Sequence, residues 1–592
     1  MRPSAACLAA AVLAGAGLCP GAQALVFRTT APASRASSTT GSSSSSGNRK
    51  QQQGSFCSGV ESNAVGNSVG SVSRPSSSSS SSSGRGRGRQ MENRALSMAT
   101  ASAGGETAMK APWLDGTAPR KLPDEISSEN PLRVVIAGGG VGGLLAAKYL
   151  KMQGHDVKVI EKTNEFRRFG GPIQLASNAL STIKAIDPEF FEKIMEYFTF
   201  TGVRTNGIKD GIRTEWYCKF DAITQMADMY SLPYTGVIDR PDLQAVLMED
   251  IGEGVVFNSQ TVVGYENTDG GVTVKLEDGG EVHADILVGA DGIWSQVRAQ
   301  MWNEDVRGEN GGATYSGYTV FAGETIYAPK DYWDVGYKVY IGPGQYFVTS
   351  DIGRGRMQWY SFLALPPGSK SREDNIQYLK DRFDGWSPEV HEALDCTSNN
   401  DVEQRDLYDR PPSLTKSWAQ GNTILIGDAC HPMMPNLGQG GCQAMEDGYM
   451  LTNMLKDVTH RSQIPDTLES FYRSRIIRTS AIQGLSRIAS DLIVKNFDTP
   501  MKMSMAPFHV DAPGGINSVM TSLMKPVLPV IFFMQFMYLY SFHPVALKDG
   551  ECEELTTKER ARAKIQVNEC WDAAKKDGTF GRGYERSQKQ FS

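Results

Sequence analysis

Three fragments of this sequence, far apart along the chain, could bind the phosphates and sugars of a dinucleotide. They are Gly138-Gly-Gly-Val-Gly-Gly143, Asp291-Gly-Ile-Trp-Ser-Gln-Val-Arg298, and Gly427-Asp428 running on to Gly438-Gln-Gly-Gly441. Glycine lets the backbone approach a phosphate closely, and free N–H groups at the start of a helix attract anions. One such fragment alone is weak evidence, but three in this order and with these flanks rarely arise by chance.

The first fragment lies where a strand must turn into a helix. Residues 132 to 137 form a short apolar run rich in β-branched side chains, typical of a buried parallel strand, and residues 142 to 153 have a helical pattern. In this turn Gly138 permits the sharp bend, Gly140 lets the backbone approach a pyrophosphate, and Gly143 lets helix and strand pack closely.

A second strand, predicted over residues 156 to 160, ends at Glu161, 23 residues after Gly138. A ribose-binding acid is expected at this distance, and an acid rather than an arginine favours an unphosphorylated 2′-hydroxyl. Glu161 therefore predicts FAD or NAD, and this part of the chain does not distinguish the two.

The other two fragments also follow predicted strands, over residues 284 to 290 and 423 to 426. The glycine-rich stretch of the last fragment opens a helix predicted over residues 442 to 456. Its N–H groups and positive dipole end can face a flavin ring, where reduction places negative charge. The candidate binding residues of these two fragments are Asp291, Gly292, Gly427, Asp428, Pro435, Gly438, Gly440 and Gly441.

These fragments are similar to those of the flavoprotein hydroxylases, and the residues between them resemble the zeaxanthin epoxidase family in particular. The resemblance covers about residues 131 to 545, and its more specific segments are Gly171-Pro-Ile-Gln174, Ser177-Asn-Ala-Leu180, Trp216-Tyr217, Tyr315-Ser-Gly-Tyr-Thr319 and Glu446-Asp447. It implies that Asp428 binds the ribityl chain of FAD, that Asp291 and Gly292 lie near the pyrophosphate, and that Arg240 lies beside the flavin.

The resemblance also implies a reaction: a flavin C4a-hydroperoxide would epoxidise the β-ring double bond of a xanthophyll. The expected conversions are zeaxanthin to antheraxanthin and antheraxanthin to violaxanthin. In some algae, diatoxanthin to diadinoxanthin is an alternative. O2 would be the co-substrate, and NADPH or reduced ferredoxin the electron donor. Because the cofactor carries the chemistry, no side chain is assigned a catalytic role, and we expect His431 to be structural.

Three other functions remain open at this point. An aromatic-ring hydroxylase would share all three fragments and differ mainly in the substrate region. A prenyl- or lipid-binding protein could use the same fold without flavin, although the retained Asp428 argues against it. A flavin reductase acting on isoprenoids would not consume oxygen.

The composition excludes several classes. A net charge of -6 over 592 residues gives no electrostatic basis for nucleic-acid binding. The nine cysteines contain no Cys-x-x-Cys pair, so we expect neither a metal site nor a disulfide framework. Cys430 and Cys442 flank the glycine-rich loop and could be redox-sensitive, but small buried thiols are the commoner case.

The N-terminal part of the chain has the composition of a targeting leader. Residues 1–24 resemble a secretory signal peptide, and residues 25–110 are rich in serine and arginine like a transit peptide and linker. Such a two-part leader resembles that of algal plastids enclosed by extra membranes, so we expect a plastid protein at the thylakoid surface. Secretion with a serine-rich disordered stalk is the alternative.

We predict an α/β fold in which a FAD-binding Rossmann-like domain of the flavoprotein hydroxylase type is interleaved with a sheet-rich substrate region and closed by C-terminal helices. The apolar run from Val527 to Phe542 is shorter than a bilayer span, which favours shallow membrane docking or packing in the core. The charged tail is too short for the forkhead-associated domain of the land-plant proteins. The predicted divisions are the core at 131–548, its substrate region mainly at 200–235 and 305–410, the closing helices at about 465–492, the docking segment at 516–543 and the tail at 549–592.

Overall fold

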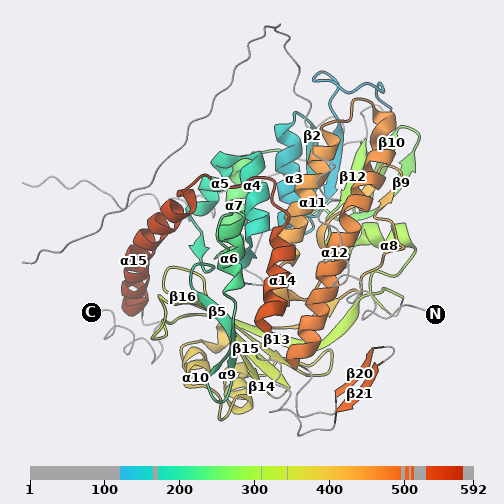
Figure 1. Cartoon of the computed structure of the whole chain (residues 1–592). Helices are drawn as coiled ribbons and strands as arrows, with labels where there is room; N and C mark the ends of the chain where they lie inside the picture. Colours follow the sequence, from blue (N-terminus) through green and yellow to red (C-terminus); the bar gives the residue numbers. More distant parts are fainter. Residues whose placement is uncertain are drawn as a thin grey trace, which may run out of the picture. The chain divides into compact units, whose positions relative to one another are not determined.

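The computed structural model describes residues 121–164, 171–308, 310–342, 344–494, 501–505, 508–512 and 528–577. The predicted leader segments 1–24 and 25–110 lie outside these residues, as do residues 516–527 of the predicted docking segment. Figure 1 gives the labels used below.

A six-stranded sheet has the strand order β18-β19-β12-β1-β2-β8. It combines strands from the first half of the chain with β18 and β19 from the second half. Neighbouring strands are parallel except the edge pair β18 and β19. β1 is buried along its whole length, as the β-branched run predicted. The strands are β1 (Arg133–Ala137), β2 (Asp156–Ile160), β8 (Val256–Phe257), β12 (Ile286–Gly289), β18 (Ala419–Gln420) and β19 (Thr423–Leu425).

Two helices cover this sheet beside the glycine-rich turn. α3 (Val141–Met152) connects β1 to β2, and α11 (Gly440–Leu455) packs against α3. A three-stranded antiparallel sheet also contacts β1 and β12. Its strands are β9 (Val262–Thr268), β10 (Gly271–Leu276) and β11 (Glu281–Ala284).

A seven-stranded sheet forms the second layer, in the order β17-β13-β16-β15-β14-β5-β6. All its pairings are antiparallel except that of β14 with β5, which brings two distant parts of the chain together. α9 (Asn375–Arg382) and α10 (Pro388–Asp395) belong to the apolar cluster on one face. The strands are β5 (Thr205–Asp210), β6 (Trp216–Lys219), β13 (Thr314–Ile326), β14 (Val335–Gly342), β15 (Gln345–Asp351), β16 (Arg356–Leu363) and β17 (Val402–Asp409).

Shorter elements join the two layers. A small sheet has the order β3-β7-β4, and α5 begins at Pro188 with Asp187 as its N-cap, whose side chain accepts a hydrogen bond from the backbone N–H of Phe190. These elements are β3 (Ile173–Leu175), β4 (Thr199–Phe200), β7 (Gly236–Ile238), α4 (Ser177–Ile186), α5 (Pro188–Met195), α6 (Ala222–Met229), α7 (Arg240–Ile251), α8 (Gln296–Trp302) and the 3-10 turns η1 (Asn399–Asp401), η2 (Gly427–Ala429), η3 (Pro435–Leu437) and η4 (Arg461–Gln463).

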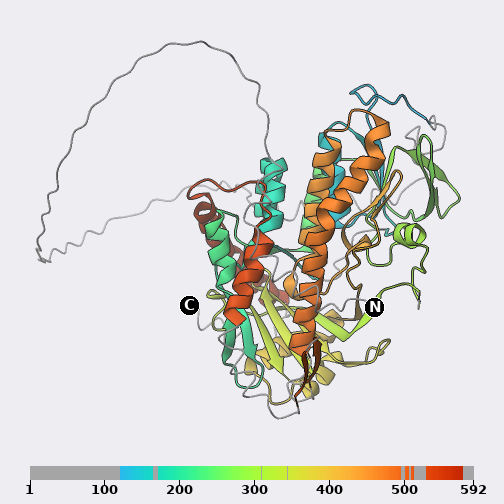
Figure 2. The same ribbon diagram turned by 45° about the vertical axis from the view of Figure 1, so that its right-hand side comes forward.

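The long helix α12 (Ile464–Val494) runs from the six-stranded sheet to the seven-stranded sheet, beside α11 and α14 (Figures 1 and 2). It contacts β18 and β19 of the first sheet and β15 of the second. α14 (Leu528–Tyr540) packs on α6. These elements confirm the predicted fold class, including its interleaved sheet and C-terminal helices. β20 (Met501–Met505) and β21 (Phe508–Ala512) form a separate antiparallel pair.

The segment predicted as a charged tail contains a 27-residue helix, α15 (Glu551–Asp577). Three glutamates in its first turn complement the positive end of the helix dipole. Leu555 and Val567 are buried, and Arg562 donates hydrogen bonds to the carbonyls of Met195 and Glu196. The charged composition concealed this helix because most of its surface remains in water.

Candidate functional site

The three fragments meet at one end of the six-stranded sheet. A Cβ on Gly138 would overlap the carbonyl group of Ala290, directly before Asp291. A Cβ on Gly142 or on Gly427 would lie 2.9 or 3.1 Å from the Cβ of Ala444 on α11. The first fragment therefore packs against the second and, through α11, against the third, and only small residues allow it.

The first turn leaves room for a phosphate. Gly138 has a φ of +110°, which favours glycine, and its N–H donates to the carbonyl of Ile160 at 2.9 Å. A Cβ on Gly143 would overlap the carbonyl oxygen of Gly138, whereas a Cβ on Gly140 would meet nothing within 4 Å. Gly140 precedes α3 and no side chain caps this helix, so open space lies before a free helix N-terminus.

Glu161 is buried and fixed to the same turn. Its Oε2 accepts a hydrogen bond from the N–H of Gly139 at 2.6 Å, and its Oε1 accepts from the N–H and hydroxyl of Thr163, each at 2.8 Å. A carboxylate can accept about four hydrogen bonds, so capacity remains for a ribose hydroxyl.

Asp291 uses one oxygen for structure and leaves the other without a partner. Its Oδ2 accepts from the N–H of Gln296, at the start of α8, at 2.8 Å. Its Oδ1 is buried with no hydrogen-bond partner among the described residues. Burial raises the pKa of Asp291. Such an unsatisfied acceptor is costly unless a ligand or water donates to it. The next residue, Gly292, has a φ of +80° and makes the turn.

Asp428 and Arg240 lie within electrostatic reach of each other. Asp428 is exposed to solvent, although many protein atoms lie around its carboxylate. Desolvation by these atoms raises the pKa of Asp428, and the electrostatic interactions of His431 and Arg240 oppose the rise. Arg240 is the first residue of α7, and its Nε is buried without a described partner.

The loop after Asp428 supplies further unpaired groups. Both amide atoms of Asn436 are buried without a partner in the described part of the chain. Pro435 starts η3, Gly438 ends it with a φ of +61°, and Gly440 begins α11. A Cβ on Gly440 would lie 3.9 Å from the Asp428 carboxylate, while Gly441 faces Ile173. A second uncapped helix N-terminus therefore lies beside the carboxylate. These unpaired groups fit FAD, which would be held along Gly140, Glu161, Asp291 and Asp428.

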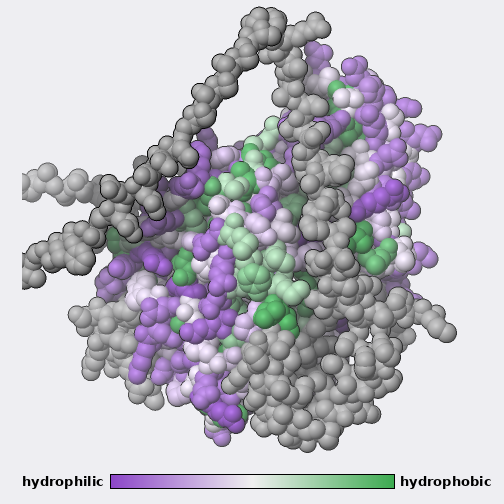
Figure 3. Space-filling model, viewed as in Figure 1, coloured by the Kyte–Doolittle hydropathy of each residue, from purple (hydrophilic) through white to green (hydrophobic). Residues whose placement is uncertain are grey.

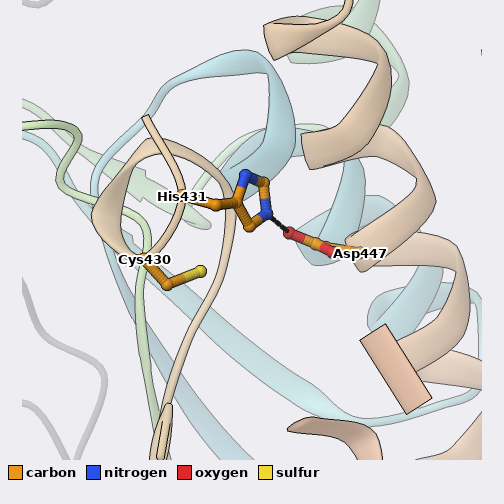
Figure 4. A group of neighbouring side chains, drawn as sticks. All are labelled: Cys430, His431 and Asp447. Carbon is orange, nitrogen blue, oxygen red and sulfur yellow. Dashed lines mark hydrogen bonds and ion pairs between the residues drawn. The ribbon is translucent and has the colours of Figure 1, made fainter. Parts of the chain in front are cut away.

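A buried cluster fixes the turn that carries Asp428 (Figure 4). The Oδ2 of Asp447 accepts from the N–H of Gly427 at 2.8 Å and pairs with the Nε2 of His431 at 2.6 Å. The Nε of Arg475 donates to its Oδ1 at 2.7 Å. Although burial raises the pKa of Asp447, His431 and Arg475 hold it below the ordinary value. His431 thus contributes to the position of this turn.

Cys430, His431 and Asp447 form a group whose candidate ligand atoms lie within 4.8 Å of one another. Metal ions bind the thiolate, but burial raises the pKa of Cys430 and keeps it a thiol. Arg475 already pairs with the carboxylate. Hydrogen bonds and ion pairs among protein groups thus already engage His431 and Asp447 in this group. Burial likewise raises the pKa of Cys442 to about 12, which argues against a reactive thiolate at neutral pH.

The cluster continues to α14 through contacts that sequence reasoning missed. Glu446 pairs with both Arg475 and Arg478 at 2.7 and 2.8 Å. Arg478 also donates to the carbonyls of Tyr538 and Leu539 in the last turn of α14. In the sequence, this cluster is indicated only by two arginines three residues apart, Arg475 and Arg478, and by the adjacent acids Glu446 and Asp447.

The seven-stranded sheet presents an apolar, aromatic face to the cofactor side. Because side chains alternate along a strand, Tyr360 and Phe362 of β16 share this face with Tyr346 of β15, which pairs with Phe362 in register. The Tyr360 phenol, next to Gly171, lies within electrostatic reach of Arg240, as Asp428 also does. A cavity of about 310 Å³ opens at this point and is lined in part by Gly171, Asp239 and Pro241.

The geometry of these turns and helix ends is that of a protein that binds a flavin nucleotide. The sequence family described as FAD binding domain matches residues 131–483. The chain belongs to this family, and its cofactor is FAD.

Individual proteins similar to this chain are more specific than the family. The chain is 41% identical over 386 residues to a chloroplastic zeaxanthin epoxidase of Spinacia oleracea, covering 63% of this chain and 56% of that protein. It is 38% identical over 421 residues to the chloroplastic zeaxanthin epoxidase of Capsicum annuum, covering 68% and 62%. The chain thus spans less than two thirds of the length of these relatives.

Solved structures share the fold. HpxO of Klebsiella pneumoniae, complexed with FAD and uric acid, matches with a TM-score of 0.58 and 20% identity over 74% of this chain and 100% of that one. A salicylate hydroxylase in a substrate complex matches with a TM-score of 0.52 and 20% identity over 71% and 100%. At this identity the likeness establishes the architecture alone.

Proposed function

We propose that this protein is a FAD-dependent monooxygenase that epoxidises the β-ring double bond of xanthophylls, in the order zeaxanthin to antheraxanthin to violaxanthin. One oxygen atom of O2 enters the carbon–carbon double bond and the other leaves as water, with two electrons from a donor and two protons. Reduced FAD supplies the oxygen activation. The names of the plant relatives support the choice of substrate.

The observation that carries this proposal is a series of aromatic and apolar side chains on one face of the seven-stranded sheet, which reaches Tyr360 beside Arg240. The ring centroids of Phe532 on α14 and Phe220 are 4.5 Å apart, and those of Phe220 and Tyr337 on β14 are 6.0 Å apart. From β14 the apolar face continues across β15 and β16 to Tyr360, beside Arg240. A long polyene with a ring at its end fits such a surface because burial in it removes a large apolar area from water.

The chain's own residues have three tasks in this reaction. Asp428, Glu161 and the uncapped helix N-termini hold FAD. The aromatic face orients the ring double bond toward the flavin and excludes water, which limits wasteful release of hydrogen peroxide. Arg240 provides positive charge where the two regions meet.

Docking of α14 on a lipid surface would give a membrane-dissolved pigment access to this face. Val530 and Ile531 are 57% and 43% exposed, while Phe536, Leu539 and Tyr540 anchor the other end of the helix in the core. Hydrophobic side chains gather over α14 in Figure 3. Among the residues that the structure describes, no helix combines the length and apolar character needed to cross a bilayer.

The docking role is tested by Ile531→Glu, with Ile565→Glu on α15 as the matched control. Both positions are exposed, so both variants should fold and retain FAD. We expect Ile531→Glu to reduce co-sedimentation with thylakoid-lipid vesicles several-fold and the control to leave it unchanged. Equal binding by the two variants would refute docking through α14. Deleting the whole helix is a poorer test because it removes core residues.

The cellular setting belongs to the same proposal. The plant relatives are named chloroplastic, which supports a plastid location. A two-part leader, a peripheral position on the thylakoid membrane and electron supply by NADPH or reduced ferredoxin complete the proposal.

The reaction is tested with the FAD-loaded full chain and zeaxanthin in thylakoid-type lipid vesicles. Separate reactions receive NADPH or ferredoxin with its reductase, each with and without oxygen. We expect antheraxanthin and then violaxanthin only when oxygen and one donor are present. Bound, reducible FAD with no pigment turnover in either reaction would refute xanthophyll epoxidation and favour an aromatic-ring hydroxylase.

A further inference from the structure

The aromatic face contains one buried hydroxyl whose lack of a partner calls for an explanation. Tyr346 lies on β15 and is 3% exposed, and its Oη has no hydrogen-bond partner among the described residues. Burial raises the pKa of this phenol far above its ordinary value, so it stays neutral and can donate or accept. A buried hydroxyl without a partner destabilises the protein unless something binds to it.

A series of neighbouring rings connects this hydroxyl to Arg240. Tyr346 stacks on Phe362 with centroids 4.1 Å apart and planes 7° apart. Phe362 in turn lies 6.3 Å from the ring of Tyr360, which lies beside Arg240. Between Arg240 and the ring of Tyr346 there are therefore two aromatic rings, those of Tyr360 and Phe362.

The stacked pair also holds the hydroxyl in one direction. Tyr318 of β13 packs edge-on against Tyr346 at 6.1 Å, so the Tyr346 ring is packed on one face and at its edge. A phenol fixed by packing binds a partner with little loss of conformational entropy, which favours a specific contact over a loose one.

We propose that Tyr346 hydrogen-bonds the hydroxyl on the ring of the substrate and thereby selects hydroxylated carotenoids over unhydroxylated ones. This inference rests on the proposed function. The hydroxyl and the reacting double bond belong to the same six-membered ring, so binding one orients the other. Sites built to bind a hydroxyl strongly reject analogues without it, because their own polar group is then left unpaired.

The test compares wild type with Tyr346→Phe, both as FAD-loaded full chains, on zeaxanthin and on β-carotene, which lacks the ring hydroxyls. Binding is followed by the pigment absorption shift and turnover by epoxide formation. We expect Tyr346→Phe to weaken zeaxanthin binding about tenfold, to lower its epoxidation at least tenfold, and to leave β-carotene binding unchanged. Tyr327→Phe is the control, since Tyr327 belongs to the apolar cluster on the opposite face of the sheet, where its hydroxyl bonds Glu392.

The outcomes separate this inference from the proposed function. If the ratio of zeaxanthin to β-carotene binding is the same in wild type and Tyr346→Phe, the inference is wrong and the hydroxyl bonds only water. If wild type binds zeaxanthin selectively, loses this selectivity in Tyr346→Phe and epoxidises neither pigment, the inference stands while the proposed reaction fails. If wild type binds neither pigment, both fail. Tyr346→Phe should melt no lower than wild type, because it removes an unpaired buried hydroxyl, whereas Tyr327→Phe should melt lower.

Discussion

The cofactor region and the seven-stranded sheet that we propose to bind the substrate, called the substrate sheet below, are held together by different forces. Around the cofactor, close backbone contacts and buried ion pairs fix the turns, as Gly138 and the Asp447–Arg475 pair illustrate. In the substrate sheet, stacked and edge-on rings such as Tyr346 and Phe362 pack against one another along one face. The cofactor region therefore tolerates little change in shape or charge, while the substrate sheet should tolerate changes of size that alter selectivity before they alter folding.

The largest effect is expected from Gly138→Ala. The new Cβ would overlap the Ala290 carbonyl and would require alanine at a φ of +110°, for a combined cost of about 4 kcal/mol. We expect little folded, FAD-containing protein, measured by flavin absorbance per chain and by thermal unfolding. The control is Gly484→Ala on α12, where no neighbour lies within 4 Å and stability should rise by up to about 1 kcal/mol. Full FAD content in Gly138→Ala would contradict the role assigned to this turn.

The next effect is the loss of one partner from the buried charge cluster. Arg475→Met removes the arginine that pairs with both Glu446 and Asp447, which are buried, and this should cost about 3 to 5 kcal/mol. Arg473→Met, two residues earlier on the same helix, breaks only an exposed pair with Glu469 and should cost less than about 1 kcal/mol. Urea unfolding of both variants measures the contrast. A similar loss of unfolding free energy in the two variants would show that burial of the cluster contributes nothing to stability.

A buried acid outside the cofactor region offers a pH test. Burial raises the pKa of Glu559 on α15 to about 7, with Arg204 opposing and Asp351 reinforcing the rise. Because the folded state holds this proton more tightly than the unfolded state, the associated stability is complete below the unfolded pKa near 4.5. It is lost as pH rises toward 7. Between pH 5 and pH 8, wild type should lose about 2 to 3 kcal/mol more stability than Glu559→Gln. Identical pH profiles in urea would rule this out.

The smallest expected effect on stability lies in the aromatic face. Phe362→Leu keeps an apolar side chain but removes the ring that stacks on Tyr346, at a cost of about 1 kcal/mol. FAD content should stay at the wild-type level, while zeaxanthin epoxidation should fall several-fold. If flavin content fell together with activity, the two regions would not be separable in the way we describe.

The sequence predicted the cofactor region better than the substrate sheet for a physical reason. A strand, a glycine turn and a helix are contiguous, so β1, β2, α3 and α11 begin and end within two residues of their predicted limits. The pairing of β5 with β14 joins residues more than a hundred positions apart, and no local pattern encodes that register. The roles of Asp447 and Arg475 were missed for the same reason, since each is an ordinary helical residue until α11 and α12 pack together.

The central claim is that the two regions act together on one molecule of oxygen. The most direct measurement supplies ¹⁸O2 and zeaxanthin in lipid vesicles to the reduced, FAD-loaded protein, and counts labelled epoxide and hydrogen peroxide per bound FAD. We predict ¹⁸O in antheraxanthin and violaxanthin, with peroxide as the minor product. If FAD is reoxidised but all the labelled oxygen appears as hydrogen peroxide or water and none in the pigment, the account of the aromatic face as a substrate site is contradicted.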